Sequence, residues 1–175
     1  MSIVTSQPLL ARLDAHDRAL MARFVLGKSH SRAHCAWWLT LTHLGGARFS
    51  IAMTFALLTV GIGQPLFVRS AISLALSHII VRIIKRRAER VRPSASMSLE
   101  ALVVIPDKFS FPSGHACAAM STAITYAILF PAAAPIIVLV AFFIGASRVA
   151  LGVHFPGDVV VGQLIALIVS AALFL

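Results

Sequence analysis

Long apolar segments follow one another through most of the chain, and they constrain its fold more than any other feature. A helix needs about 20 predominantly apolar residues to cross a bilayer. The candidate spans are residues 49–62, 65–84, 113–130, 136–151 and 158–175, with Asp158 expected as the N-cap of the last. The 175-residue chain is 59% hydrophobic and 12% charged, which leaves too little polar surface for a water-soluble domain. We therefore predict an all-α fold, a polytopic membrane bundle of about five transmembrane helices.

The first 47 residues have a different pattern. Apolar and charged side chains alternate at helical spacing over residues 9–26, which predicts an amphipathic helix that lies in the membrane interface or packs on the bundle. Residues 36–44 are apolar but too short to span, and Trp37 and Trp38 at their start suit the interfacial belt. We divide the chain into an interfacial N-terminal segment, 1–47, and a membrane-embedded core, 48–175.

Positive charge is concentrated in the first half of the chain. The formal net charge is +9, with a dense basic run over residues 82–92. Such an excess suits nucleic acid, an anionic membrane surface or an anionic substrate. Because the run adjoins an apolar segment and no nucleic-acid motif accompanies it, we expect no nucleic-acid partner. Cys35 and Cys117 lack the neighbours of a metal or redox motif.

The chemically informative polar residues gather in two loops, 85–111 and 152–157, and their flanks. The two spans joined by residues 131–135 should form a hairpin, which places both loops on one membrane face. Three groups stand out there: Lys85 with Arg92-Pro93; Phe111-Pro112-Ser113-Gly114-His115; and Ser147-Arg148 with His154 and Asp158.

These residue types meet the needs of phosphate-ester chemistry. Arg and Lys stabilise phosphate oxygens, and glycine at a helix start lets backbone N–H groups approach them. One histidine oriented by a carboxylate can act as nucleophile, while a second protonates the leaving group. His43 and His78 stand alone, and we assign both to structure.

The three groups resemble the signature of the type 2 phosphatidic acid phosphatase superfamily: Lys-x6-Arg-Pro, Pro-Ser-Gly-His and Ser-Arg-x5-His-x3-Asp. All three are complete and in order over residues 85–158. Residues 42–46, THLGG, are also similar to the segment before the second membrane helix of small bacterial members.

The resemblance implies a role for each matching residue. His154 would attack phosphorus, Asp158 would orient it, and His115 would be the general acid. The phosphate would be held by Lys85, Arg92, Ser113, Gly114 and Arg148. The implied reaction is hydrolysis of a lipid phosphate monoester or diphosphate through a phosphohistidine. No cofactor or metal is implied, in agreement with the lack of a carboxylate cluster in the sequence.

Several alternatives stay open. The same residues would serve a phosphotransferase that passes phosphate to a second lipid, and a catalytically silent scaffold or transporter would share the fold. Apolar spans argue against the soluble relatives, the vanadium haloperoxidases and secreted acid phosphatases. Phosphatidic acid, phosphatidylglycerol phosphate, prenyl phosphates or diphosphates and a prenyl-phosphoryl sugar phosphate all fit as substrates. Oligomeric state is left open.

We expect an integral protein of the bacterial inner (cytoplasmic) membrane. Bacterial members of the family usually have one more membrane helix ahead of those found here, and we find neither that helix nor a signal peptide. Basic residues exceed acidic ones in the N-terminal segment. The positive-inside rule then places the N-terminus and the active site on the cytoplasmic face.

Overall fold

The computed structural model describes residues 9–26, 31–59, 64–97, 99, 101–105 and 107–175. Its helices are α1 Leu9–Phe24, α2 Arg32–Leu44, α3 Ala47–Ala56, α4 Gln64–Ala88, α5 Pro93–Ser96, α6 Gly114–Leu129, the 3-10 helix η1 Pro131–Ala133, α7 Ala134–Ala150 and α8 Pro156–Phe174. The only strand-like pairing in the described ranges is an isolated bridge between Val91 and Phe109. The all-α prediction is confirmed.

Within the described ranges, three helical segments are long and apolar enough to cross a membrane: Gln64–Ala88, Pro131–Ala150 and Pro156–Phe174. Helix α6 has 16 residues and would extend roughly 24 Å, slightly short of the hydrocarbon thickness. Helix α3 has 10 residues. The protein is a membrane bundle, and the number of about five spans stays a prediction.

The bundle turns large apolar side chains outward and small or polar ones inward. Ile79, Phe142 and Ile168 are 52%, 49% and 69% exposed on the outer faces of α4, α7 and α8. Inside, Ser73 Oγ lies 3.1 Å from Ser121 Oγ and 2.9 Å from Ser170 Oγ, which links α4, α6 and α8. The apolar outer faces suit contact with lipid tails, whereas interhelical hydrogen bonds and close packing hold the interior together.

Helix α6 is the centre of the bundle and packs against α3, α4, α7 and α8. Its buried alanines allow close approach of these neighbours. Gly162 of α8 faces the backbone of Ser113 so closely that a Cβ would overlap the Ser113 carbonyl oxygen. This contact holds the start of α6 beside the second turn of α8.

The start of α8 differs from the sequence prediction. Phe155 is the N-cap, and Asp158 is the third residue of the helix rather than its cap. Asp158 Oδ2 instead accepts a hydrogen bond from Phe155 N at 2.9 Å. The preceding turn contains Gly152 at φ 80°, a left-handed conformation that glycine adopts without steric cost.

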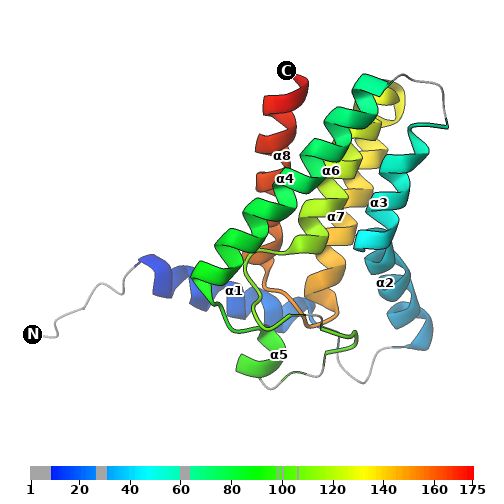
Figure 1. The fold of residues 1–175 in the computed structure, drawn as a ribbon. Helices are drawn as coiled ribbons and strands as arrows, with labels where there is room; N and C mark the ends of the chain where they lie inside the picture. The colour runs from blue at the N-terminus through cyan, green and yellow to red at the C-terminus, as the bar shows by residue number, and fades with distance from the viewer. Residues whose placement is uncertain (1–8, 27–30, 60–63, 98, 100, 106) are drawn as a thin grey trace, which may run out of the picture.

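Helix α1 lies across one end of the bundle, and the C-terminus lies at the opposite end (Figure 1). Met21 of α1 is fully buried against Phe155 and Val159, so the predicted amphipathic helix is docked on the bundle. Helix α2 packs against α7. The boundary at residue 47 stays a prediction.

Candidate active site

A polar cavity of about 180 Å³ lies where the ends of several helices meet. The residues that line it are Gly45, Ala47, His78, Lys85, Arg92, Asp107, Gly114, His115, Arg148 and His154. They come from α3, α4, α6 and α7 and from the connections α2–α3, α4–α5, α5–α6 and α7–α8. The two predicted loops do therefore meet in space.

Six of the eight predicted site residues line this cavity, and two lie behind it. Ser113 is fully buried, and its Oγ accepts from Ala116 N at 3.4 Å as the N-cap of α6. Asp158 is also fully buried and lies next to His154. These two residues can support the lining, but neither is part of it.

His154 sits on the short connection between α7 and α8 with its ring in a defined orientation. Its Nδ1 lies 3.4 Å from Asp158 Oδ2, and its Nε2 lies 3.3 Å from Arg92 Nη1 in the cavity wall. The first distance suffices to orient the ring but exceeds that of a strong hydrogen bond. Burial lowers the pKa of His154 to about 4, against the opposing effect of Asp158. At neutral pH the ring is therefore uncharged. A proton on Nδ1 toward Asp158 would leave the Nε2 lone pair in the cavity, where it can accept a hydrogen bond from Arg92 Nη1.

Arg92 is held by backbone and side-chain acceptors. It donates to Val153 O at 2.8 Å and to Asp107 O at 3.0 Å. Its Nη2 also lies 2.5 Å from Asp107 Oδ1, while Lys85 Nζ lies 3.0 Å from Asp107 Oδ2. Burial raises the pKa of Asp107, but hydrogen bonds from Arg92 and Lys85 outweigh it and keep the pKa below its usual value. An ionised carboxylate thus bridges two of the predicted phosphate ligands.

The segment 42–46 has a direct part in the site. Arg148 is almost fully buried and donates through Nη1 to Thr42 Oγ1, while its Nε is buried with no hydrogen-bond partner among the described residues. A Cβ on Gly45 would lie 3.2 Å from His115 O, so only a residue without a side chain packs there easily. Thr42 and Gly45 thus position the third cation and the second histidine.

Sequence reasoning overlooked His78 and Asp107 as site residues. His78, assigned to structure, lies in the cavity wall, with its Nε2 4.0 Å from where a Cβ on Gly114 would be. It lies two helical turns before Lys85 on α4, and that spacing is the signal that could have found it. Asp107 carries no comparable signal, because only the folded loop brings it to the cations.

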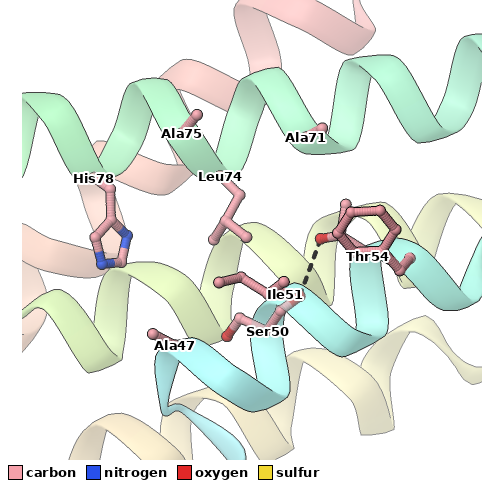
Figure 2. Close-up of a pocket in the computed structure, with 9 residues that line it drawn as sticks. Ala47, Ser50, Ile51, Thr54, Ala71, Leu74, Ala75 and His78 are labelled. Carbon is pink, nitrogen blue, oxygen red and sulfur yellow. Dashed lines mark hydrogen bonds between the residues drawn. The ribbon is translucent and has the colours of Figure 1, made fainter.

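An apolar groove of about 300 Å³ opens beside the polar cavity, between α3 and α4. Figure 2 shows Ile51 and Thr54 of α3 facing Leu74 and Ala75 of α4, with His78 at one end. Ala47 and His78 line both the groove and the polar cavity. An amphiphile with an anionic head could therefore occupy both at once.

Cations gathered around an uncharged histidine, at the end of a lipid-facing bundle, suit the transfer of phosphate from a membrane-bound molecule. That chemistry defines the class as a membrane-embedded phosphatase. The chain belongs to the PAP2 superfamily, whose family model matches residues 66–175.

The relatives differ in their lipids. The chain is 31% identical over 155 residues to decaprenylphosphoryl-5-phosphoribose phosphatase of Mycobacterium tuberculosis, covering 89% of this chain and 80% of that protein. It is 30% identical over 112 residues to lipid A 1-phosphatase of Rhizobium etli, covering 61% and 47%.

Two solved structures share the fold. The first transmembrane PAP2 type phosphatidylglycerolphosphate phosphatase from Bacillus subtilis has a TM-score of 0.69 at 24% identity, covering 92% of this chain and 86% of that one. Aquifex aeolicus LpxE has a TM-score of 0.72 at 22% identity, covering 98% of both chains.

Proposed function

We propose that this protein hydrolyses a lipid phosphate monoester or diphosphate through a phosphohistidine on His154, without a metal ion. One observation carries the proposal: His154 Nε2 faces a cavity lined by Lys85, Arg92 and Arg148, while Nδ1 faces Asp158. Three cationic side chains can supply the charge stabilisation that a metal ion provides in other phosphatases.

In the first step, His154 Nε2 attacks phosphorus and the bond from phosphorus to the lipid oxygen breaks. His115, in the cavity wall, gives a proton to the departing alkoxide, and the phosphoryl group stays on Nε2. The imidazolium character that develops on His154 is stabilised by Asp158, which is ionised and fully buried beside it.

In the second step, His115, now neutral, takes a proton from water as that water attacks phosphorus. The phosphorus–nitrogen bond breaks, inorganic phosphate leaves, and His154 returns to its starting form. The cations hold the same oxygens through both steps. The proton that His115 gives to the alkoxide in the first step is replaced by the one that it takes from water in the second. The cycle therefore needs only water and the phosphate ester.

The groove between α3 and α4 supports a lipid substrate. It is almost wholly apolar, and it meets the phosphate cavity at Ala47 and His78. A prenyl or acyl chain would lie in the groove while its phosphate reached the cations. Among the candidates, we favour a prenyl-linked phosphate, because the relative matched over most of this chain acts on a decaprenyl-linked one.

We also propose that the active site lies on the cytoplasmic face of a bacterial inner membrane. Basic side chains such as Arg86 and Arg87 are exposed at the cavity end of α4, whereas α8 carries none toward the C-terminus. Positive charge near span ends favours the cytoplasmic side.

The test combines product analysis with trapping. Purified protein is given a panel of labelled lipid phosphates, with and without chelator, and its label is trapped after rapid denaturation. We expect free phosphate, resistance to chelator, inhibition by vanadate, and acid-labile label on the wild type but not on His154→Ala. Folding of the variant is checked by its melting temperature in detergent.

Each alternative has its own result. Label retained on His154→Ala would refute the nucleophile. Loss of activity in chelator, restored by a divalent ion, would refute metal independence. Phosphate passed to a second lipid would indicate a phosphotransferase, and no turnover on any lipid would favour a silent membrane protein.

A further inference from the structure

Arg90 lies at the meeting point of three carboxylates but belongs to none of the signature groups. Its Nη1 lies 2.7 Å from Asp158 Oδ1. On the other side, its Nη2 lies 2.9 Å from Asp14 Oδ1 and 2.8 Å from Asp17 Oδ2, both on α1. Its guanidinium also stacks over Phe155, 4.1 Å from the ring centroid. A planar fork of donors can satisfy carboxylates on two sides at once, which a lysine cannot do.

Asp158 depends on Arg90 for its charge balance. It is fully buried, its Oδ2 faces Phe155 N and His154 Nδ1, and Arg90 is the fixed positive charge on Oδ1. A buried carboxylate without a cationic partner is strongly disfavoured. Without Arg90, Asp158 would either take up a proton or move, and in both cases His154 would lose its orientation.

Helix α1 holds Arg90 through Asp14 and Asp17, on the side of the guanidinium away from Asp158. Asp17 Oδ1 also accepts a hydrogen bond from Gly157 N at 2.7 Å, so the same carboxylate ties α1 to the first turn of α8. A Cβ on Gly157 would come within 2.7 Å of Asp17, and this leaves little space for any other residue there. Burial lowers the pKa of Arg90, but the carboxylates of Asp158, Asp14 and Asp17 outweigh burial and raise it.

We propose that Arg90 is a positioning residue that fixes Asp158 against His154, and that Asp14 and Asp17 of α1 keep Arg90 in place. The proposal rests on the proposed role of His154 as nucleophile. It gives the N-terminal amphipathic helix a function in catalysis, because α1 completes the charge network behind the nucleophile. Undocking of α1 would then weaken the site without touching the cavity.

The network makes a separate prediction for each of its two sides. The charged and titratable groups facing His154 are Asp158, Arg92, Arg148 and His115. Those facing Arg90 are Asp158, Asp14 and Asp17, with Arg18 paired to Asp14 at 2.7 Å. Arg90→Gln removes a positive charge, so the His154–Asp158 pair should take up its proton at higher pH. Asp17→Asn loosens the hold of α1 on Arg90 and also removes a negative charge. These two effects shift the pH of proton uptake in opposite directions, so the test for this variant is kcat, which should fall.

The experiment measures kcat, KM and the pH profile of full-length variants, together with the rate of phosphoenzyme labelling. For Arg90→Gln we expect kcat to fall by roughly 10- to 100-fold, as for a misplaced catalytic group, with little change in KM. The acidic limb of its profile should move to higher pH, and Arg90→Lys should recover part of the activity. Arg87→Gln is the matched control, since Arg87 is exposed on the same segment, and it should behave as the wild type.

Three results would overturn the proposal: wild-type kcat in Arg90→Gln, an acidic limb that does not move in Arg90→Gln, or wild-type kcat in Asp17→Asn. If Arg90→Gln does not fold, the kcat values of Arg90→Lys and Asp17→Asn decide whether Arg90 positions Asp158. A wild-type protein that forms no acid-labile label refutes the phosphohistidine mechanism itself. Normal label on the wild type with normal kinetics in Arg90→Gln refutes only the role of Arg90.

Discussion

The carboxylate of Asp107 is paired with Lys85 and Arg92, two of the cations that are proposed to hold phosphate. Its removal therefore tests whether these cations bind phosphate. Its carboxylate bridges Arg92 Nη2 at 2.5 Å and Lys85 Nζ at 3.0 Å, and it lines the cavity. A phosphate that binds both cations must compete with this carboxylate. We therefore expect Asp107→Asn to bind inorganic phosphate and vanadate more tightly than the wild type.

The expected gain in anion affinity follows from the exposure of the Asp107 side chain. The Asp107 side chain is 45% exposed, so each of its ion pairs contributes about 0.5 kcal/mol after solvent screening. Two pairs give about 1 kcal/mol, which corresponds to roughly fivefold tighter anion binding. Arg92 should keep its place, because Val153 O and the Asp107 carbonyl still accept its hydrogen bonds at 2.8 and 3.0 Å.

The assay is competitive inhibition by phosphate and by vanadate at neutral pH, where Asp107 is ionised. Glu89→Gln is the matched control, because Glu89 is exposed and its replacement removes the same charge from the same loop region. Inhibition constants that fall in Asp107→Asn but not in Glu89→Gln support the reasoning. Weaker inhibition in Asp107→Asn would refute it and would mean that Asp107 orients the cations for substrate rather than competing with it.

Four further outcomes are expected. His115→Ala should lose less activity on a nitrophenyl phosphate than on a lipid phosphate, because a phenolate needs less protonation; equal losses would remove His115 as general acid. The acidic limb of kcat/KM, corrected for substrate ionisation, should lie well below pH 6.5, because burial keeps His154 uncharged down to about pH 4; a limb near 6.5 would contradict this. Gly162→Ala should destabilise the protein by about 1–3 kcal/mol in detergent melting, since its Cβ would overlap backbone at Ser113; an unchanged melting temperature would argue against that packing. Alkaline phosphatase fused after Leu175 should be active and a fluorescent fusion dim, because the C-terminus lies opposite the active-site end (Figure 1); bright fluorescence would place the active site outside.

Local chemistry was enough to predict the elements and most of the cavity. Apolar segments of membrane length can hardly form anything but helices, because backbone groups in lipid must be satisfied internally. Lys85, Arg92, His115, Arg148 and His154 were predictable because their types and spacing match a known reaction site. All five line one cavity.

The direction in which side chains point at the helix starts was harder to predict. Ser113 and Asp158 belong to the signature, yet both lie behind the cavity, where Ser113 caps α6 and Asp158 bonds to Phe155 N. A side chain near a helix start can turn inward to cap backbone groups or outward to bind a ligand, and both uses favour the same residue types. Only the packing of α6 against α8 decides between them.

The residues found by structure alone owe their place to contacts between distant segments. Asp107 reaches Lys85 across a long loop, Thr42 of α2 reaches Arg148 on the neighbouring α7, and Asp17 reaches Arg90 from the N-terminal helix. None of these pairs has a periodic spacing or a local motif. The sequence by itself determined the class of fold and the chemistry of the cavity, because both depend on local residue types. The tertiary structure decided which charges lie next to each other, because that depends on how the helices cross and where α1 docks.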